Sequence, residues 1–469
     1  MKLTTADLRR IPHRALRIPE SSPRWNATGV STDSRTVGTG MLFVALRGER
    51  FDGHRFLGDA VTRGAAGLVV DAAGEASAPP GIPLLVVEDT VAALGALAHL
   101  HRRRFDIPVI AVGGSNGKTT TKEMIAGVLG TRYRVLATQG NLNNHIGVPQ
   151  TLFRLDRKHE IAVVEVGTNH PGELGPLCRM LAPTHVFLTN IGHEHLEYFQ
   201  SLEGVAEEET MLWRWADGRG RPLVFYNGDD TVVRAAAEGL PHATSFGFAM
   251  RSARVKGSRV RINAQGCAAF GFRGGRMAQP AQVTMRVPGV HNALNALGAA
   301  AVGLAFRVPA RSIVTALQEF RAPGKRMEVL QIGGVTVLND TYNANGDSSI
   351  AALHTLAATP AQGKRIAVFG DMFELGSHSS AEHTRVGEAA AALHTDYVLT
   401  VGKLAGDISR AAAGCTTVHY EQKNMLAEYL AELIGPGDVV LIKGSRGMAM
   451  EDIVVFLQQR AAPVPPART

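Results

Sequence analysis

The sequence contains few cysteines, few aromatic residues and no long apolar run. Its three cysteines, Cys178, Cys267 and Cys415, are far apart and form no CxxC pair, which argues against a disulfide framework or a thiolate zinc site. No uninterrupted apolar stretch of about 18 residues occurs, and residues 1–10 carry charges where a signal peptide would be apolar. We therefore expect no membrane insertion and no export, and we predict a protein of the reducing cytoplasm.

The charge and the aromatic content argue against nucleic-acid binding. Lysine and arginine number 49 against 42 aspartates and glutamates, the net charge of +7 is spread over the chain, and the only dense basic run is at 102–104. Aromatic residues make up 6% of the chain, so no stacking surface for bases is evident. A mild positive excess suits small anionic substrates such as nucleotides.

The length of 469 residues predicts about three domains, at about 150 residues per domain. The 51 glycines separate short β-rich runs from helical patterns, which indicates an α/β protein with parallel sheets. We predict domains at 1–105, 106–322 and 323–469, the last beginning at a Pro-Gly pair and ending in a disordered, proline-rich tail at 461–469. Strands are predicted at 41–46, 67–71, 84–88, 108–112, 161–164, 185–188, 223–225, 335–338, 365–369, 397–401 and 439–442, an antiparallel extension at 245–287, and helices at 91–103, 122–129 and 292–306.

A glycine-rich loop at 113–120, with the sequence GGSNGKTT, follows the first central strand and precedes a helix. Backbone N–H groups of such a loop bind phosphates, while a lysine reaches the terminal phosphates and a hydroxyl binds magnesium. Gly117, Lys118 and Thr119 fit these parts, although Val112 stands where the standard motif has its first glycine. We predict a nucleotide site here.

Polar clusters follow three other central strands, at 165–167, 190–195 and 227–230. Ligands of parallel sheets bind beyond the carboxyl ends of the strands, so these clusters should converge with the glycine loop. Glu165 and His195 are then candidates to complete a magnesium shell. The alternatives are a surface carboxylate and an ordinary hydrogen-bonded histidine.

Five motifs, in order, resemble the Mur ligase family: GSNGKTT at 114–120, EVG at 165–167, NIGHEHLE at 190–197, GVHN at 289–292 with Asn295, and NDTYNAN at 339–345. The resemblance covers nearly the whole chain. It implies an N-terminal domain that binds the UDP of the substrate, a central ATP-binding domain and a C-terminal Rossmann-like domain that closes over the site.

Within the family, the stretches at 340–345, 370–376 and 443–446 resemble the member that joins D-alanyl-D-alanine to UDP-N-acetylmuramoyl-tripeptide, and the DNPR sequence of the ligase that adds the third residue is absent. The resemblance implies a monomeric ligase of peptidoglycan synthesis that uses ATP and Mg²⁺ and forms an acyl phosphate. The alternatives are a relative that adds a single amino acid, a folylpolyglutamate-type synthetase, a P-loop ATPase acting on nucleic acid, and a nucleotide-gated binding module.

Matching positions carry the family's roles to residues of this chain. The resemblance implies catalytic roles for Lys118, His195 and Arg326; ATP contacts from Gly114, Ser115, Asn116, Gly117, Lys118, Thr119, Thr120, His291, Asn292, Asn295, Arg326 and Asp340; UDP-substrate contacts from Asp33, Ser34, Arg35, Asn143 and Asn144; dipeptide contacts from Lys443, Ser445 and Arg446; and metal contacts from Thr119, Glu165, His195 and Glu209.

One position departs from the family pattern. Many members carry a lysine shortly after the histidine motif, and carbon dioxide converts it to a carbamate that helps to hold magnesium. Glu207, Glu208 and Glu209 occupy this stretch here, and Glu209 aligns with the lysine. We predict that Glu209 supplies a permanent carboxylate in its place. The alternative is that the three glutamates form a solvated helix face.

Overall fold

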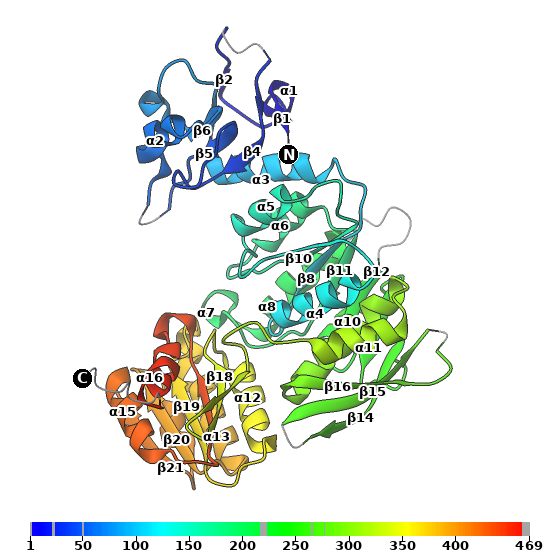
Figure 1. Ribbon diagram of the computed structural model, residues 1–469, viewed down its shortest axis with the longest axis vertical. Helices are drawn as coiled ribbons and strands as arrows, with labels where there is room; N and C mark the ends of the chain where they lie inside the picture. Colours follow the sequence, from blue (N-terminus) through cyan, green and yellow to red (C-terminus); the bar gives the residue numbers. More distant parts are fainter. Residues whose placement is uncertain are drawn as a thin grey trace, which may run out of the picture.

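The computed structural model describes residues 2–20, 24–48, 51–215, 223–263, 266–275 and 277–461. Three α/β units follow one another along the molecule, with the N-terminal sheet at one end and the C-terminal sheet beside the central unit at the other (Figure 1). The tail predicted to be disordered lies, apart from Ala461, outside the described residues. No helix of the described chain is both long and apolar enough to cross a membrane.

The N-terminal unit contains a five-stranded sheet in the order β2-β7-β6-β5-β4, parallel except for the pair β2 and β7, and a small antiparallel pair, β1 and β3. The predicted strands and helix of this region are confirmed. The elements are β1 (Leu3–Thr4), α1 (Thr5–Leu8), β2 (Ala15–Arg17), β3 (Asn26–Ala27), β4 (Gly29–Ser31), β5 (Met41–Val44), η1 (Gly53–Phe56), α2 (Leu57–Thr62), β6 (Gly67–Asp71), η2 (Glu75–Ser77), β7 (Leu84–Val87) and α3 (Thr90–Arg102).

The central unit contains a nine-stranded sheet in the order β16-β15-β14-β13-β12-β11-β8-β10-β9. The pairs from β9 to β14 are parallel and the last two are antiparallel, so the predicted antiparallel extension continues the same sheet. The elements are β8 (Val109–Gly113), α4 (Lys118–Gly130), β9 (Val135–Ala137), α5 (Gly147–Phe153), β10 (Ile161–Glu165), α6 (Leu174–Leu181), β11 (His185–Leu188), α7 (Leu196–Phe199), α8 (Leu202–Thr210), η3 (Met211–Trp215), β12 (Leu223–Asn227), α9 (Thr231–Ala236), β13 (Ala243–Gly247), β14 (Val255–Ile262), β15 (Cys267–Gly274), β16 (Ala281–Pro288), α10 (Val290–Ala305) and α11 (Ala310–Glu319).

Helices cover both faces of the parallel part of this sheet, which explains why its strands are continuous apolar runs. In β8, Ile110 and Val112 belong to the apolar cluster that includes α4 and α10. Val109 and Ala111, which point to the opposite face, belong to the cluster that includes α5 and α6. The alanine-rich face of α10 is buried, as the sequence predicts.

The C-terminal unit is a six-stranded sheet in the order β17-β18-β22-β19-β20-β21, parallel except for β17. The four predicted strands are confirmed, and two further strands, β17 and β21, form its edges. The elements are β17 (Glu328–Ile332), β18 (Val335–Asp340), α12 (Gly346–Ala358), β19 (Arg365–Gly370), η4 (Gly376–His378), α13 (Ser379–Ala392), β20 (Tyr397–Val401), α14 (Gly406–Ala411), β21 (Thr416–Tyr420), α15 (Lys423–Leu433), β22 (Val439–Lys443), η5 (Arg446–Met448) and α16 (Glu451–Ala461).

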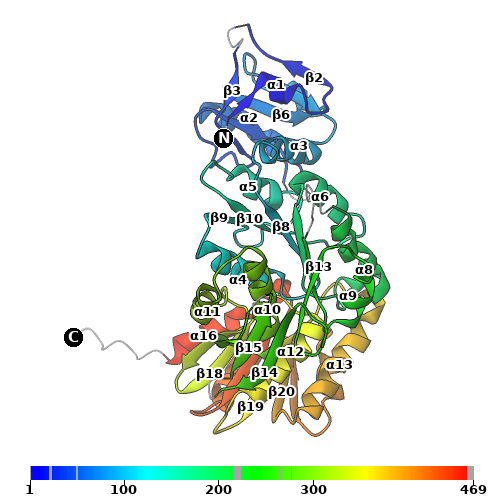
Figure 2. The ribbon, with the colours of Figure 1, turned by 90° about the vertical axis from the view of Figure 1, so that its right-hand side faces the viewer.

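The C-terminal unit contacts the loop that follows β11 of the central sheet. Backbone and side-chain hydrogen bonds join His193 to Asp347 at the start of α12, and Glu197 to Glu374. Figure 2 shows the two units packed together at the end of the molecule opposite the N-terminal unit. The carboxyl end of β11 therefore faces the C-terminal unit.

Candidate active site

The glycine-rich loop runs directly from β8 into α4, which begins at Lys118 rather than at the predicted position 122. Gly114 has a φ of +110°, and a Cβ on it would lie 2.2 Å from Thr189 Oγ1, so this position requires glycine. The Asn190 side chain fixes the loop, because it accepts a hydrogen bond from the Asn116 N–H and donates one to the Asn116 carbonyl, each 2.9 Å long. The loop thus ends at a helix N-terminus, as a phosphate site requires.

Lys118 lies at the end of the loop, as the first residue of α4, and is surrounded by carboxylates. Its Nζ donates to the carbonyls of Gly114 and Ser115 at 2.5 and 3.1 Å and lies 3.5 Å from Glu194 Oε2. Burial alone would lower the pKa of Lys118, but the charges of Glu194, Glu209 and Glu165 outweigh it and raise the pKa. Lys118 therefore keeps its positive charge beside the phosphate loop.

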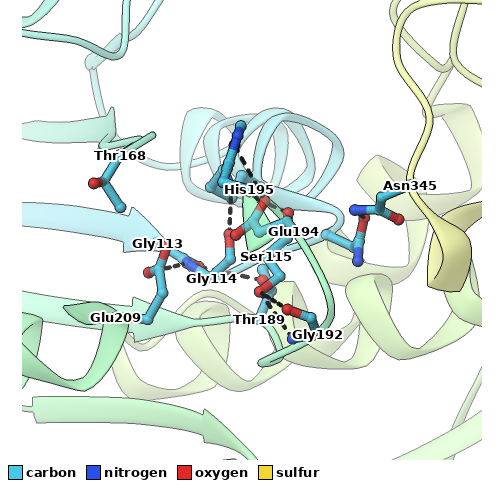
Figure 3. Close-up of polar contacts among 12 residues, drawn as sticks. Gly113, Gly114, Ser115, Thr168, Thr189, Gly192, Glu194, His195, Glu209 and Asn345 are labelled. Atoms are coloured by element: carbon cyan, nitrogen blue, oxygen red, sulfur yellow. Dashed lines mark hydrogen bonds and ion pairs between the residues drawn. The ribbon is translucent and has the colours of Figure 1, made fainter. Parts of the chain in front are cut away.

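Glu209 reaches this cluster from α8. It is 1% exposed, and its Oε2 accepts a hydrogen bond of 2.7 Å from the Gly114 N–H (Figure 3). Burial raises the pKa of Glu209 to about 7, opposed by Lys118 and reinforced by Glu194. A Cβ on Gly113 would lie 3.0 Å from the same Oε2, so the glycine leaves room for this carboxylate.

The solvated-face alternative for the three glutamates is wrong. Glu207 is exposed, but Glu208 is buried and accepts hydrogen bonds from the backbone N–H groups of Gly172 and Leu174 at 2.8 and 2.7 Å. Glu208 therefore caps the N-terminus of α6, while Glu209 faces Lys118. The side chains of these two adjacent residues of α8 have different partners because they point in different directions from the helix.

Glu165 is the last residue of β10, and it is 2% exposed. Its Oε1 accepts hydrogen bonds from Thr119 Oγ1 at 3.1 Å and from Asn143 Nδ2 at 2.9 Å. Its Oε2 is buried and finds no hydrogen-bond partner among the described residues. A buried carboxylate oxygen without a partner is a candidate ligand for a cation.

His195 also belongs to the cluster, and it joins the central unit to the C-terminal unit. Its Nδ1 lies 2.5 Å from Glu374 Oε2 and its Nε2 lies 3.8 Å from Glu194 Oε2. From the C-terminal unit, Asn345 Nδ2 donates to Asn116 Oδ1 at 3.0 Å, and Figure 3 shows Asn345 on the other side of the loop from Glu209. The structure thus gathers Lys118, Glu165 and His195 at one sheet edge.

The polar cluster after β12 serves the backbone instead. Asp230 accepts hydrogen bonds from the Ile191 N–H and from the first N–H groups of α9, and Asp229 accepts those of residues 248–250. Both oxygens of each carboxylate therefore accept protein donors, and Asp230 contributes to the site by fixing the loop that carries His195.

The start of α10 adjoins the phosphate loop. A Cβ on Gly117 would lie 3.0 Å from Asn295 Oδ1, and Asn295 in turn donates to Asn292 Oδ1 at 3.3 Å. Burial lowers the pKa of His291, with Asp340 opposing and Lys443 reinforcing the shift, so His291 faces the C-terminal unit. These positions suit the predicted nucleotide contacts.

Asp340 and Lys443 are paired at the ends of two neighbouring strands, β18 and β22. Lys443 is 3% exposed, and its Nζ donates to Asp340 Oδ2 at 2.6 Å and to the Asn343 carbonyl at 2.8 Å. Ser445 is buried, and its Oγ accepts the Phe373 N–H at 2.8 Å. Of the three predicted dipeptide residues, Arg446 is therefore the one that lies exposed.

Arg326 does not contact the phosphate loop. Its guanidinium lies 3.6 Å from the centre of the Tyr342 ring, within the C-terminal unit. Among the described residues no polar contact joins Arg326 to Lys118, although the family resemblance assigns both to the nucleotide. Arginine on a domain that packs against the nucleotide site can approach the phosphates only by a shift of that domain or of its own side chain.

The predicted UDP-substrate residues lie in two places. Asp33, Ser34 and Arg35 line a pocket of about 820 Å³ in the N-terminal unit, together with Thr32, Phe51, Phe56, Asp59, Thr62 and Arg63. A hydrogen-bonded pair with Arg35 lowers the pKa of Asp33 to about 2. Asn143 contacts Glu165 instead, and Asn144 caps the start of α5 by accepting the N–H groups of Ile146 and Gly147.

Three consecutive segments of the chain match models of one family. Residues 26–102 match the Mur ligase family, catalytic domain, residues 112–303 match the Mur ligase middle domain, and residues 325–446 match the Mur ligase, glutamate ligase domain. The chain belongs to the Mur ligase family.

Sequence relatives and solved structures agree with this assignment. This Mur ligase is 37% identical to the UDP-N-acetylmuramoyl-tripeptide–D-alanyl-D-alanine ligase of Escherichia coli (strain K12), over 92% of this chain and 93% of the relative. The enzyme of the same name from Bacillus subtilis (strain 168) is 33% identical to this Mur ligase, over 92% of this chain and 94% of the relative.

Among solved structures, MurF from Acinetobacter baumannii is 30% identical with a TM-score of 0.88, covering 98% of this chain and 99% of that one. MurF ligase from Thermotoga maritima, solved in complex with ADP, is 25% identical with a TM-score of 0.81, covering 92% of this chain and 97% of that one. The three-unit architecture of this Mur ligase is therefore that of solved family members.

The residues of this Mur ligase around Lys118 fit a magnesium ion. No three His, Cys, Asp or Glu side chains of the described chain form a ready-made metal cluster. Magnesium at nucleotide sites, however, takes only one or two carboxylates and completes its shell with phosphate oxygens and water. Glu165 has an Oε2 without a hydrogen-bond partner among the described residues, and its other oxygen is bonded to Thr119. Three carboxylates surround the single positive charge of Lys118, so the charge balance also favours a cation.

Three residues that this Mur ligase uses at the site escaped the sequence analysis. Glu194 pairs with Lys118, while Asp347 and Glu374 bind the loop after β11 from the C-terminal unit. Glu194 lies inside a recognised motif, and its position between two histidines was the available signal. Asp347 lies in no recognised motif, and Glu374 lies inside the recognised stretch at 370–376. Their contacts could not be inferred in either case, because the partners are more than 150 positions away in the sequence.

Proposed function

We propose that this Mur ligase joins D-alanyl-D-alanine to the terminal carboxylate of UDP-N-acetylmuramoyl-tripeptide, at the expense of ATP, and thereby forms the pentapeptide precursor of peptidoglycan. Relatives named UDP-N-acetylmuramoyl-tripeptide–D-alanyl-D-alanine ligase match over nearly the whole chain. The observation that carries the proposal is the convergence of a phosphate loop, Lys118 and three buried carboxylates at a sheet edge that faces the C-terminal unit.

The first step is the transfer of a phosphoryl group to the tripeptide. A carboxylate is a poor acyl donor, because oxide is a bad leaving group. A tripeptide carboxylate oxygen attacks the γ-phosphorus of ATP, the bond from that phosphorus to the bridging oxygen breaks, and ADP leaves. Two anions meet in this step, so Lys118 at the helix N-terminus stabilises the charge on the transferring group. The product is an acyl phosphate.

The second step forms the amide bond. The amine of D-alanyl-D-alanine attacks the carbonyl carbon of the acyl phosphate, and the tetrahedral intermediate loses a proton and expels phosphate. We propose that Arg326 binds the phosphate oxygens, for which its planar fork is suited, and that Arg446 with Lys443 and Ser445 binds the dipeptide carboxylate.

Magnesium, when bound, would offset the charge of the phosphate oxygens. We propose that Thr119, Glu165, His195 and Glu209 hold it, directly or through water. Glu165 supplies the carboxylate oxygen that lacks a protein partner, and Glu209 contributes negative charge while it orients the Gly114 N–H.

We propose the remaining assignments on the same basis. The domains span 1–105, 106–322 and 323–469; the pocket at Asp33, Ser34 and Arg35 receives the UDP part of the substrate; and Asn143, beside Glu165, meets its peptide end. Asn144 belongs to the same segment. The enzyme acts as a monomer in the cytoplasm on small-molecule substrates and does not bind nucleic acid.

An acceptor screen tests the proposed function. Phosphate release by the purified full chain is measured with ATP, magnesium and UDP-N-acetylmuramoyl-tripeptide, with and without D-alanyl-D-alanine. We expect release only with the dipeptide, and a product heavier by the dipeptide less water. Release triggered by single amino acids, by folate with glutamate, or by DNA or RNA would instead establish one of the alternatives, and tight ATP binding without acceptor-dependent release would indicate a binding module.

A further inference from the structure

Two arginines of the C-terminal unit share one aromatic ring. The guanidinium carbon of Arg326 lies 3.6 Å from the centre of the Tyr342 ring, and that of Arg446 lies 5.6 Å from the same centre. Both distances are within the range of cation–π attraction, which extends to about 6 Å. Arg326 precedes β17 and Arg446 follows β22, so residues from distant parts of the sequence meet at Tyr342.

Hydrogen bonds of the main chain bring Tyr342 next to the segments that carry its two partners. The Tyr342 N–H donates to the Lys325 carbonyl at 3.0 Å, next to Arg326. On the other side, the Arg446 N–H lies 3.4 Å from Asn343 Oδ1. These contacts hold the backbone of residues 342–343 next to that of Lys325 and Arg446 without the use of the arginine side chains.

Neither guanidinium is neutralised by a carboxylate of the chain that the structure describes. Among the described residues, Arg326 and Arg446 form no ion pair with a carboxylate, whereas the neighbouring Lys443 is paired with Asp340. A guanidinium stacked on a ring keeps its in-plane N–H donors available, since the ring occupies only its face. Two such cations on one ring form a receptor for anions, and the reaction brings two anions to this unit: the transferred phosphoryl group and the dipeptide carboxylate.

We propose that Tyr342 is a positioning residue that holds Arg326 and Arg446 as one anion-binding pair, Arg326 for the phosphoryl group and Arg446 for the carboxylate of the incoming dipeptide. This inference rests on the proposed function, because that function supplies the two anions. The new element is that one ring supports both arginines, so that the loss of the Tyr342 ring weakens the binding of two different substrates.

The test compares Tyr342→Leu, which removes the ring, with Tyr342→Phe, which keeps it. Ligation is measured at varied ATP and at varied D-alanyl-D-alanine. We expect Tyr342→Leu to raise the KM for both substrates by about fivefold, the strength of a partly exposed cation–π contact, with kcat falling less than KM rises. Tyr342→Phe should remain within about twofold of the wild type.

A loss in Tyr342→Phe as large as that in Tyr342→Leu would overturn the proposal, because the hydroxyl and not the ring would then be responsible. A change confined to one substrate would overturn it as well. Should Tyr342→Leu fail to fold, as judged by thermal unfolding, Tyr342→Gln replaces it with a side chain of similar polarity and no ring.

A double-mutant cycle shows whether Tyr342 acts through the arginines. We expect Tyr342→Leu to add little to the dipeptide KM of an Arg446→Ala enzyme, and little to the ATP KM of an Arg326→Ala enzyme. Fully additive effects would refute the shared support. The wild type is assayed first: if it shows no dipeptide-dependent phosphate release, the proposed function fails, whereas an active wild type with an unaffected Tyr342→Leu variant refutes this inference alone.

Discussion

Lys118 is a cation held among three carboxylates at the end of a phosphate loop. Its side chain is not part of an apolar core, so its loss should affect chemistry more than folding. We expect Lys118→Ala to lower kcat/KM for ligation by about a thousandfold or more, because the charge that stabilises the transferring phosphoryl group is removed. The measurement is dipeptide-dependent phosphate release, with circular dichroism to confirm the fold.

Lys158→Ala is the matched control, because Lys158 is exposed in the same unit and far along the chain from the loop. It should retain wild-type turnover. A folded Lys118→Ala enzyme with near-normal turnover would count decisively against the mechanism.

The position of Glu209 predicts that the ligation rate does not depend on bicarbonate. Its carboxyl group already lies at the phosphate loop, where it accepts the Gly114 N–H, so above its pKa of about 7 no modification is needed to place negative charge there. We expect ligation at about pH 8 to be the same in carbon-dioxide-free buffer and with added bicarbonate. Clear stimulation of the wild type by bicarbonate would refute the substitution. A Glu209→Lys variant should show the opposite behaviour, with activity that depends on bicarbonate.

Glu209 also predicts how the stability of the ligand-free protein depends on pH. Burial raises the pKa of Glu209 to about 7 from an ordinary value of 4.5, so the folded protein holds this proton more tightly than the unfolded chain does. The stabilising contribution is complete below about pH 4.5 and is lost as the pH rises through about 7, with a total of about 3 kcal/mol at most.

Urea unfolding at about pH 5 and about pH 8, without nucleotide or magnesium, measures this contribution. The wild type should lose more stability over this interval than Glu209→Gln, which cannot ionise at this position. Equal losses in the two proteins would show that Glu209 does not titrate in this range.

At the residue scale, the sequence predicts the phosphate loop well and the carboxylates around it only in part. Lys118, Thr119 and Glu165 follow strands at fixed offsets, so local pattern and the rule for strand ends suffice to bring them together. Glu194 was not selected, because its task depends on the distance to Lys118, and that distance is set by the path of the loop. Local pattern contains no such information.

At the element scale, Glu208 connects two helices. Its carboxylate accepts two backbone N–H groups at the start of α6, although it belongs to α8. We expect Glu208→Ala to lower the free energy of unfolding by about 1–3 kcal/mol, because the buried Leu174 N–H and the Gly172 N–H both lose their acceptor. Glu207→Ala on the exposed side of the same helix is the control and should change stability by less than about 0.5 kcal/mol. Equal effects of the two substitutions in urea unfolding would contradict the capping role.

The strands show which elements a sequence can predict. The strands at the centre of each sheet are buried on both faces and form continuous apolar runs, which are recognisable without structure. The edge strand β21 is mostly exposed and mixes polar with apolar residues, and it was not predicted. An edge strand has one paired neighbour and little apolar surface to bury, so its sequence is less constrained.

At the scale of the whole molecule, the contact between the central and C-terminal units depends on residues that no local motif predicts. Asp347, at the start of α12, accepts the His193 N–H at 2.8 Å and lies 3.1 Å from its Nδ1, while its other oxygen is paired with Arg385 at 2.8 Å. These contacts lower the pKa of Asp347 in spite of its burial, so it remains ionised. The loop that carries His195 is thereby tied to the unit that carries Arg326.

We expect Asp347→Ala to loosen this docking without unfolding either unit, because each unit has an apolar core of its own. The radius of gyration from small-angle X-ray scattering should increase, and kcat/KM for ligation should fall by about tenfold, since the groups that meet the two substrates are no longer held in register. Asp407→Ala is the matched control, because Asp407 also lies in the first turn of a helix and pairs with an arginine, Arg410, but within its own unit. A compact Asp347→Ala enzyme with the activity of Asp407→Ala would show that docking relies on the remaining contacts, Glu374 with His195 among them.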